Sequence, residues 1–293
     1  MNGKSVASIV KTKLRLYWPL IKSLQTGLLL STGIAGYLSV HAPVRLGQLL
    51  GLSASLFLAI SGSTILNMWY DRDIDARMKR THKRPAAAGM LGQREVFRLG
   101  MVVSILGVGG AVALSARYGL VVFAGLFFDV IVYTLWLKRR SCWSIVWGGV
   151  SGGMPILAGR VLAMGRVDLV GLLLTLAILF WIPTHTLTFS IKFDQDYRAA
   201  GVPTFPSTYG MAFTRTTIAV STVLAAAAIG WAGVLIGIQA GFLRLLAVLA
   251  SGLLVISFAS VTRPSDRANF ALFRYASFYM LASMILLSVG RLI

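Results

Sequence analysis

The sequence predicts an all-α, polytopic membrane protein with about nine transmembrane helices. The chain has 293 residues, of which 57% are hydrophobic and only 13% are charged, and its mean hydropathy is +0.78. Soluble domains typically carry about 25% charged residues. The apolar runs here are roughly 18 to 24 residues long, which is the length that crosses a bilayer as a helix.

The nine predicted spans follow from the positions of the apolar runs. They cover residues 18–38, 47–66, 96–115, 119–137, 143–162, 169–190, 215–238, 243–261 and 271–290. We expect one domain over residues 1–293, because no boundary or low-complexity tract interrupts the series. The fifth span contains the run WGGVSGGMP, whose small residues favour close helix packing. A thinned wall beside a bulky ligand is the alternative.

Lysine and arginine positions predict a cytoplasmic N-terminus. We expect the chain to lie in the plasma or inner membrane. In that orientation the inner segments hold 22 of the 28 lysines and arginines, including Lys4 and Lys11 of the N-terminal head. The net charge of +19 then reflects topology and contact with anionic lipid. Its spread over many short loops argues against a nucleic-acid partner. Seven of the nine acids also fall on the inner side, so we expect the chemistry there. Cys142 is the only cysteine, which excludes an internal disulfide.

A dense cluster of charge, NMWYDRDIDARMKRTHKRP, runs from Asn67 to Pro85. Asn67, Asp71 and Asp75 recur at every fourth residue, and each such step turns a helix by only about 40°, so they share one face. Oxygen ligands in this arrangement suit Mg²⁺, which usually binds one or two carboxylates plus substrate phosphates. The neighbouring bases suit a polyphosphate anion.

Other residues of this cluster have simpler interpretations. Asp73 points away from the acidic face, and we expect it to pair with Arg77, four residues on. Residues 81–85 should form a turn that ends the segment. For the bases alone, a juxtamembrane helix that sets topology explains the pattern equally well.

A second acidic stretch, KFDQDYRAAGVPTFP, runs from Lys192 to Pro206 on the same predicted side. Pro203 and Pro206 should break the helix. His185, Lys192 and Asp196 are separated by seven and four residues, so we expect them on one helix face. The stretch could supply a second half-site for metal or diphosphate. The alternative for this stretch is a solvated helix end without a ligand. For His185 the alternative is a histidine that is only hydrogen-bonded within the membrane.

Asp129 lies inside the fourth predicted span, where a carboxylate is costly and functional by default. A structural hydrogen bond and a role at the cavity are equally open for it. No P-loop, dinucleotide fingerprint or HExxH motif is present. Two acidic patches at the inner face of an apolar bundle indicate ionisation of a lipid diphosphate. Mg²⁺ and the bases would neutralise the leaving group, and an acceptor would trap the allylic cation.

The first motif resembles the signature of the UbiA-type intramembrane prenyltransferases. Its matching residues are Asn67, Asp71, Asp75, Arg80, Arg84 and Pro85. Within that superfamily the chain is most similar to the protoheme IX farnesyltransferase branch. This similarity lies in YTLWLKRR (133–140), SIVWGGVSGGMP (144–155), DYRAAGVPTFP (196–206) and LFRYASFYMLA (272–282). Asp129 and Arg160 occupy positions where the family pattern suggests uncharged residues.

The resemblance implies nine transmembrane helices around a central cavity, with two acidic motifs that face each other under cytoplasmic loops. It implies transfer of a farnesyl group from farnesyl diphosphate to a vinyl group of heme B, giving heme O, with Mg²⁺ as cofactor. The implied metal ligands are Asn67, Asp71, Asp75 and Asp196, and Lys192 and His185 join these four as catalytic residues. The implied substrate-binding residues are Arg72, Lys79, Arg80, Arg84, Asp194, Tyr197 and Arg198.

The expected partners are therefore farnesyl diphosphate, heme B and membrane lipid, together with proteins of the heme pathway or of oxidase assembly. Two other functions stay open. One is a UbiA-type prenyltransferase that acts on a quinone precursor, a chlorin or a lipid headgroup. The other is a non-catalytic protein that binds or transports lipid diphosphates or porphyrins.

Overall fold

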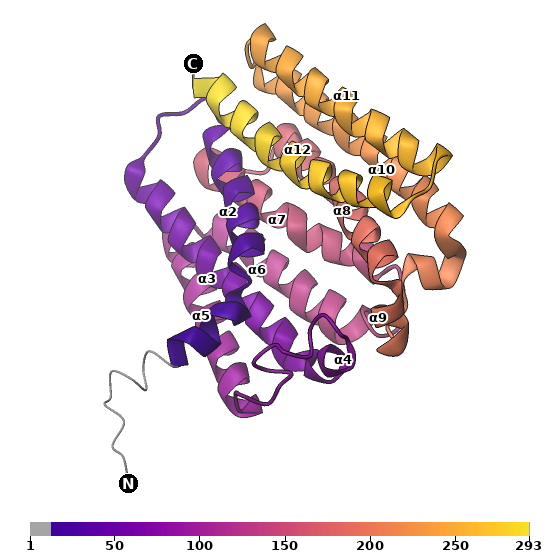
Figure 1. Cartoon of the computed structure of the whole chain (residues 1–293). Coiled ribbons are helices and arrows are strands. Elements are labelled where there is room, and N and C mark those ends of the chain that lie inside the picture. The colour runs from indigo at the N-terminus through magenta and orange to yellow at the C-terminus, as the bar shows by residue number, and fades with distance from the viewer. Residues whose placement is uncertain (1–12, 293) are drawn as a thin grey trace.

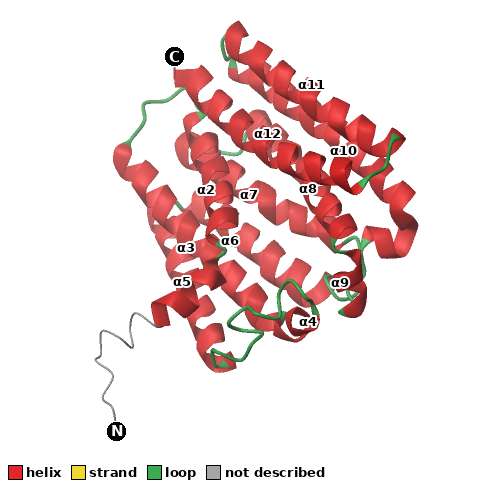
Figure 2. Ribbon diagram, in the orientation of Figure 1, coloured by secondary structure: helices red, strands yellow, loops and turns green. Residues whose placement is uncertain are grey.

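The computed structural model describes residues 13–292, so Lys4 and Lys11 lie outside the described residues. The described part consists of helices and loops without strands (Figure 2), which confirms the predicted fold class. The helices in chain order are η1 (Trp18–Ile21), α2 (Ser23–Leu38), α3 (Leu46–Tyr70), α4 (Arg72–Arg77), α5 (Gln93–Leu114), α6 (Ala116–Phe127), η2 (Phe128–Leu137), α7 (Ser144–Met164), α8 (Leu169–Lys192), α9 (Asp194–Ala199), α10 (Phe205–Ile236), α11 (Ala240–Thr262) and α12 (Asp266–Leu292).

Eight helical segments of the described chain are long and apolar enough to cross a membrane. They are α3, α5, α6 with η2, α7, α8, α10, α11 and α12, and each contains most of one predicted span. The remaining prediction, residues 18–38, is divided at Lys22, where a left-handed backbone (φ 45°) separates η1 from α2. The 16 residues of α2 measure about 24 Å at 1.5 Å per residue, less than the hydrocarbon core of about 30 Å. The N-in orientation and the central cavity stay predictions.

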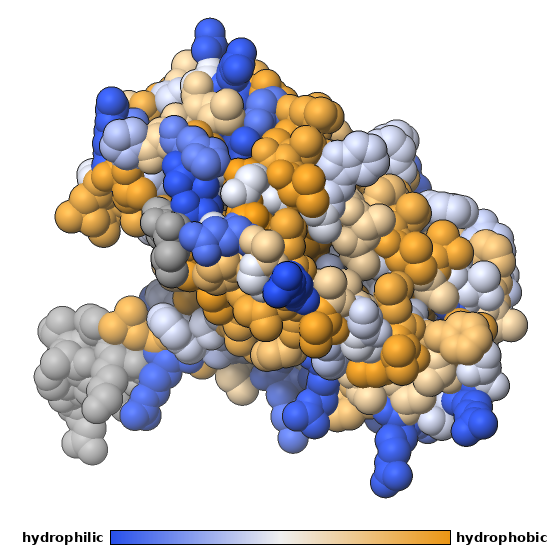
Figure 3. Space-filling view, turned by 90° about the horizontal axis from the view of Figure 1, so that it is seen from above, coloured by the Kyte–Doolittle hydropathy of each residue, from blue (hydrophilic) through white to orange (hydrophobic). Residues whose placement is uncertain are grey.

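The long helices form three neighbouring groups (Figure 1). On one side lie α3, α5 and α6, in the middle α2, α7 and α8, and on the other side α10, α11 and α12. The short helices α4 and α9 lie at the same end of this bundle. Figure 3 shows apolar side chains across much of the face in view, as expected for helices that contact lipid rather than water.

Small residues let α7 approach its neighbours closely. A Cβ atom on Gly159 would lie 1.9 Å from the carbonyl oxygen of Gly33 in α2, and one on Gly36 would lie 2.0 Å from the carbonyl oxygen of Ile156. Within the run WGGVSGGMP, a Cβ on Gly153 would lie 2.7 Å from Thr175 of α8. The interpretation of this run as a close-packing segment is therefore confirmed.

We expect Gly159→Ala to destabilise the protein, because the added methyl group meets backbone that side-chain rotation cannot move. Overpacking of this kind typically costs about 1–3 kcal/mol. Gly230→Ala in α10 is the matched control, since no atom lies within 4 Å of its added Cβ. Thermal unfolding of both variants in detergent checks the prediction. Equal midpoints for the two would contradict the close α2–α7 contact.

A buried ion pair joins α2, α7 and α8 at the end away from α4 and α9. The Arg160 guanidinium donates to both carboxylate oxygens of Asp168 (2.7 and 2.8 Å) and to the hydroxyl of Ser39 (2.7 Å). Asp168 also accepts from the backbone N–H of Gly171 (3.1 Å) and so caps α8. Because its charge is fully paired, Arg160 can lie inside α7 without a direct role in chemistry.

Candidate functional site

The first acidic motif crosses from α3 into α4. Asp71 lies between the two helices, yet the backbone N–H of Asp71 donates to Asn67 (2.9 Å) and that of Asp75 donates to Asp71 (2.8 Å). These bonds keep the helical spacing, so the three side chains share one face as predicted. All three residues are buried, with exposures of 8, 4 and 6% in chain order, whereas the side chain of Asp73 is 47% exposed.

Each buried carboxylate of this motif is paired with a cation. The Lys138 ammonium donates to Asp71 Oδ2, and Arg84 Nη1 donates to both oxygens of Asp75 (3.0 and 2.8 Å). Asp71 Oδ1 is buried and has no hydrogen-bond partner among the described residues. A free, buried carboxylate oxygen fits a metal ligand, because leaving it unpaired would otherwise be costly.

The expected pair of Asp73 with Arg77 does not form, and this prediction is wrong. Arg139, which follows η2, donates to both Asp73 oxygens (2.8 and 2.6 Å) and lies over the ring of Tyr70. The hydrogen bond from Arg139 holds the pKa of Asp73 below its ordinary value. A two-pronged guanidinium pair is stronger than a solvated pair four residues apart, so the tertiary contact prevails.

Two lysines, Lys138 and Lys22, also belong to this site. The sequence alone predicts for them only a role in setting membrane topology. Burial would lower the pKa of the Lys138 ammonium, but Tyr133 and Asp71 together raise it above its ordinary value. Lys22, at the break between η1 and α2, has its pKa lowered to about 8, first by burial and then by Arg84 and Lys138. The motif YTLWLKRR points to Lys138. Only the tertiary structure brings Lys22 here.

The two acidic motifs meet through α4 and α9, as the family resemblance implies. Ile74 and Met78 pack against Ala200 and Val202, with Tyr197 beside them. This apolar cluster holds α4 and α9 together at one end of the bundle, the arrangement visible in Figure 1. Tyr197 therefore contributes packing between the motifs.

The polar residues of α9 differ from the prediction. Helix α8 ends at Lys192 and α9 begins at Asp194, so His185 and Asp196 lie in different helices. Asp196 Oδ2 instead accepts from the backbone N–H of Arg80 (3.2 Å) in the first motif. Arg198 pairs with Asp194 (2.7 Å), whose Oδ1 is buried without a partner among the described residues.

Pro203 lies in the non-helical segment that separates α9 from α10, which agrees with its predicted role as a helix breaker. Residues 201–204 are extended or turn-like, and Thr204 caps α10 in a capping box with Ser207. Pro206 lies in the first turn of α10, where a missing N–H costs nothing, so the expectation that it breaks a helix is wrong.

Aromatic rings line the space between α8 and α12. His185 lies between the rings of Trp181 (4.9 Å) and Phe273 (4.5 Å), and its Nδ1 is 3.1 Å from the hydroxyl of Ser277. Lys192 lies over the ring of Phe270, 4.1 Å from its centre. The structure therefore places His185 and Lys192 beside aromatic rings and not beside Asp196.

The remaining predicted bases lie at the rim of the site. The Arg80 guanidinium covers the rings of Phe189 (4.8 Å) and Phe193 (5.3 Å), so it links the first motif to the aromatic residues of α8. Arg72 and Lys79 are exposed. Exposed bases at this rim can reach a phosphate without losing an internal partner.

Asn67 completes the site from within α3. Its amide nitrogen donates to Asp129 (2.9 Å), and its amide oxygen accepts from the buried hydroxyl of Thr134 (2.7 Å). Among residues 13–292, no three His, Cys, Asp or Glu side chains converge to hold a metal by themselves. The free Asp71 oxygen nevertheless fits Mg²⁺, which completes its shell with water and substrate phosphates.

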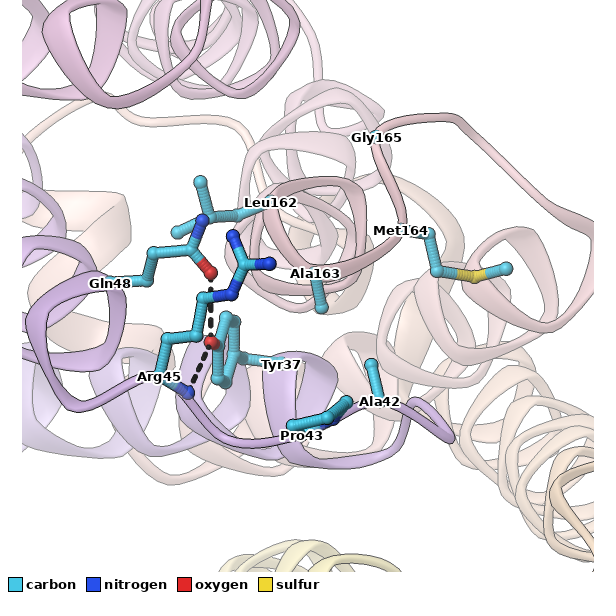
Figure 4. Close-up of a pocket in the computed structure, with 9 residues that line it drawn as sticks. All are labelled: Tyr37, Ala42, Pro43, Arg45, Gln48, Leu162, Ala163, Met164 and Gly165. Carbon is cyan, nitrogen blue, oxygen red and sulfur yellow. Dashed lines mark hydrogen bonds between the residues drawn. The ribbon is translucent and has the colours of Figure 1, made fainter.

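A separate pocket of about 310 Å³ lies at the other end of α2 and α7 (Figure 4). Tyr37 lies in it, where its hydroxyl donates to Gln48 (3.0 Å) and accepts from the backbone N–H of Arg45 (3.2 Å). None of the predicted site residues lines this pocket. This pocket therefore lies apart from the predicted site residues.

The sequence and the fold both resemble known proteins. The pattern of the UbiA prenyltransferase family matches residues 28–282. A protein named protoheme IX farnesyltransferase from Archaeoglobus fulgidus is 43% identical over 199 residues, which cover 68% of this chain and 70% of the relative. A protein of the same name from Pyrobaculum neutrophilum is 34% identical over 262 residues, covering 89% and 94% of the two chains.

Two solved structures share the fold at low sequence identity. A structure described as digeranylgeranylglyceryl phosphate synthase aligns with a TM-score of 0.79 and 17% identity, over 96% of this chain and 99% of that one. A UbiA homolog from Archaeoglobus fulgidus bound to GPP and Mg²⁺ aligns with a TM-score of 0.67 and 12% identity, over 93% and 99% of the two chains.

Proposed function

The chain belongs to the UbiA prenyltransferase family and is a multi-pass membrane prenyltransferase, and from this premise we propose that it farnesylates heme B. The donor is farnesyl diphosphate, the acceptor is a heme vinyl group and the product is heme O. The observation that carries the acceptor is the 43% identity to a protein named protoheme IX farnesyltransferase. The buried, cation-paired carboxylates under α4 and α9 support diphosphate as the leaving group.

The diphosphate lies between the two acidic motifs in this proposal. Asn67, Asp71, Asp75 and Asp196 would hold Mg²⁺ with it, and bound Mg²⁺ would supply Lewis-acid neutralisation of the leaving oxygen. Lys138 and Arg84 already lie against the metal-binding carboxylates, so both can turn to phosphate oxygens. Arg72, Lys79, Arg80 and Arg198 form the outer part of the phosphate site.

The reaction breaks the bond between farnesyl C1 and the diphosphate oxygen. The allylic cation adds to the terminal carbon of the vinyl group, and water captures the resulting cation and loses a proton. The rings around His185 and Lys192 provide apolar π faces that stabilise a cation and accommodate a planar acceptor.

We assign the site to the cytoplasmic side and the chain to the plasma or inner membrane. The excess of lysine and arginine in loops at the α4 and α9 end supports this orientation. Heme-pathway or oxidase-assembly proteins would supply heme B and receive the product, and membrane lipid would surround the apolar helices.

The proposal is tested by incubating membranes that contain the protein with farnesyl diphosphate, Mg²⁺ and heme B. Mass spectrometry of the extracted hemes should show heme O, and omission of Mg²⁺ should remove it. Transfer to an added quinone precursor, chlorin or lipid without farnesylated heme would favour a different acceptor. Binding of farnesyl diphosphate without any transfer would favour a carrier.

The lowered pKa of Lys22, about 8, gives a pH prediction. A cationic Lys22 beside Asp71 and Arg84 assists capture of the diphosphate, and the uncharged amine does not. The value of kcat/KM for farnesyl diphosphate should therefore fall as pH rises through about 8, since this ratio reports groups of the free enzyme. Lys22→Arg should remove the fall, because arginine stays protonated. Identical profiles for both proteins would contradict a role for Lys22.

A further inference from the structure

Asp129 is the one acid that lies within the predicted spans, and the proposed reaction does not use it. It lies in η2, which packs against α3, and it is half-buried. Its Oδ2 accepts two hydrogen bonds, one from the hydroxyl of Ser63 and one from the amide nitrogen of Asn67 (2.9 Å). Because two donors point at the same oxygen, Oδ2 acts as an acceptor here.

We propose that Asp129 is a positioning residue of the prenyl-transfer site, which acts through Asn67 by fixing the direction of its side-chain amide. A carboxylate oxygen only accepts hydrogen bonds, so Asn67 can face it only with its NH₂ group. The hydroxyl of Thr134 cannot make this choice, because a hydroxyl donates or accepts equally well. Asp129 therefore decides that the Asn67 oxygen, and not its nitrogen, is presented for coordination.

The winding of η2 makes this contact geometrically possible. The segment is a π-helix, in which the backbone bonds join residues five apart, as between the N–H of Lys138 and the carbonyl of Tyr133 (2.8 Å). Residue i+5 then lies nearly above residue i, so Thr134 follows Asp129 on one face. In an α-helix the same two residues would be separated by about 140°, and Asp129 and Lys138 by about 180°.

One stretch of π-helix thus presents three groups to α3 in succession. Asp129 and Thr134 hold the two ends of the Asn67 amide, and Lys138 reaches Asp71 one helical turn further along α3. The negative charge of Asp129 also acts on Lys22. It is among the groups that raise the pKa of that lysine, against the lowering caused by burial. π-Helix is rare in proteins, and where it occurs as a short interruption of an α-helix it is frequently at a functional site.

Mn²⁺ affinity of the purified full chain tests the inference. Free Mn²⁺ is measured by electron paramagnetic resonance during titration in the presence of farnesyl thiolodiphosphate, an analogue whose C1–S bond ionises slowly. Residues that orient a metal ligand typically change affinity by about 10- to 100-fold. We expect a weakening of this size in Asp129→Ala. We expect a smaller one in Asp129→Asn, whose own amide can turn and accept either orientation of Asn67.

Two further variants separate positioning from packing and from direct coordination. Ser63→Ala removes the other hydrogen bond to Asp129 but leaves Asn67 in place, so its Mn²⁺ affinity should stay close to that of the wild type. In an Asn67→Ala background, Asp129→Ala should cause no additional loss, because both variants remove one shared interaction. If Asp129→Ala does not fold, Asp129→Asn, which preserves the side-chain volume, is measured in its place.

The inference is overturned if Asp129→Ala and Asp129→Asn bind Mn²⁺ as tightly as the wild type. It is equally overturned if Asp129→Ala adds its full loss to that of Asn67→Ala, which would mean that Asp129 acts on the metal itself. The inference rests on the proposed function only for the metal and diphosphate. A wild type that binds no Mn²⁺ therefore overturns both, whereas Mn²⁺ binding without heme farnesylation overturns the proposed acceptor alone.

Discussion

Replacement of Asp71 by alanine is expected to lower farnesyl transfer by on the order of 1000-fold, which is the upper range for loss of one electrostatic group in an active site. Asp71 carries the one carboxylate oxygen of its motif that is buried without a partner, and its other oxygen accepts from Lys138. The variant loses a metal ligand and leaves the buried Lys138 ammonium unpaired. Asp75→Ala should have a similar effect, because it leaves Arg84 unpaired. Turnover in membranes, with heme analysis by mass spectrometry, measures both.

Asp73→Ala is the matched control for this prediction. Asp73 lies in α4, as Asp75 does, but it is half-exposed and pairs with Arg139 outside the acidic face. Because unpaired buried charges destabilise by several kcal/mol, Asp71→Asn is needed beside Asp71→Ala. It keeps the volume and removes the charge. Membrane insertion of every variant is verified by its yield after extraction. Turnover like that of the wild type in Asp71→Ala or Asp75→Ala would contradict the metal assignment.

Arg84→Met is expected to reduce kcat/KM for farnesyl diphosphate by on the order of 100-fold. In the free protein Arg84 donates to both oxygens of Asp75, and it lies close enough to Lys22 to lower the pKa of that lysine. It is therefore placed to exchange Asp75 for a phosphate oxygen when the substrate binds. Arg84→Lys should recover only part of the rate, because an ammonium cannot make the two-pronged contact.

Arg77→Met provides the comparison for Arg84. Arg77 is an exposed base at the end of α4, with no ion pair to a described residue, and it stands seven residues before Arg84. Its loss should leave kcat/KM close to that of the wild type. Steady-state kinetics in detergent with varied farnesyl diphosphate separate the two cases. Equal losses in both variants would show that total positive charge, and not the Arg84–Asp75 geometry, governs capture of the diphosphate.

The sequence by itself determined the class of fold and the face that carries the acids. Apolar run length located eight of the spanning helices, because a membrane helix must satisfy its own backbone bonds and cannot end inside the hydrocarbon. The four-residue spacing of Asn67, Asp71 and Asp75 predicted that they share one face, and the prediction holds because helical hydrogen bonds continue through the junction of α3 and α4. Such features depend on neighbours within about one or two helical turns, which sequence spacing records directly.

Only the tertiary structure decided which groups surround that face. Arg139, and not Arg77, pairs with Asp73. Asp196 accepts a hydrogen bond from the backbone N–H of Arg80. Lys22 lies near a site whose other residues are 45 or more positions away in the sequence. The π-helix brings Asp129 and Lys138 to the same side, which α-helical spacing would have placed on opposite sides. These contacts depend on a local change of winding, a helix break and packing between distant segments. None of the three leaves a periodic signal in the sequence, which is why the acidic face was predictable and its partners were not.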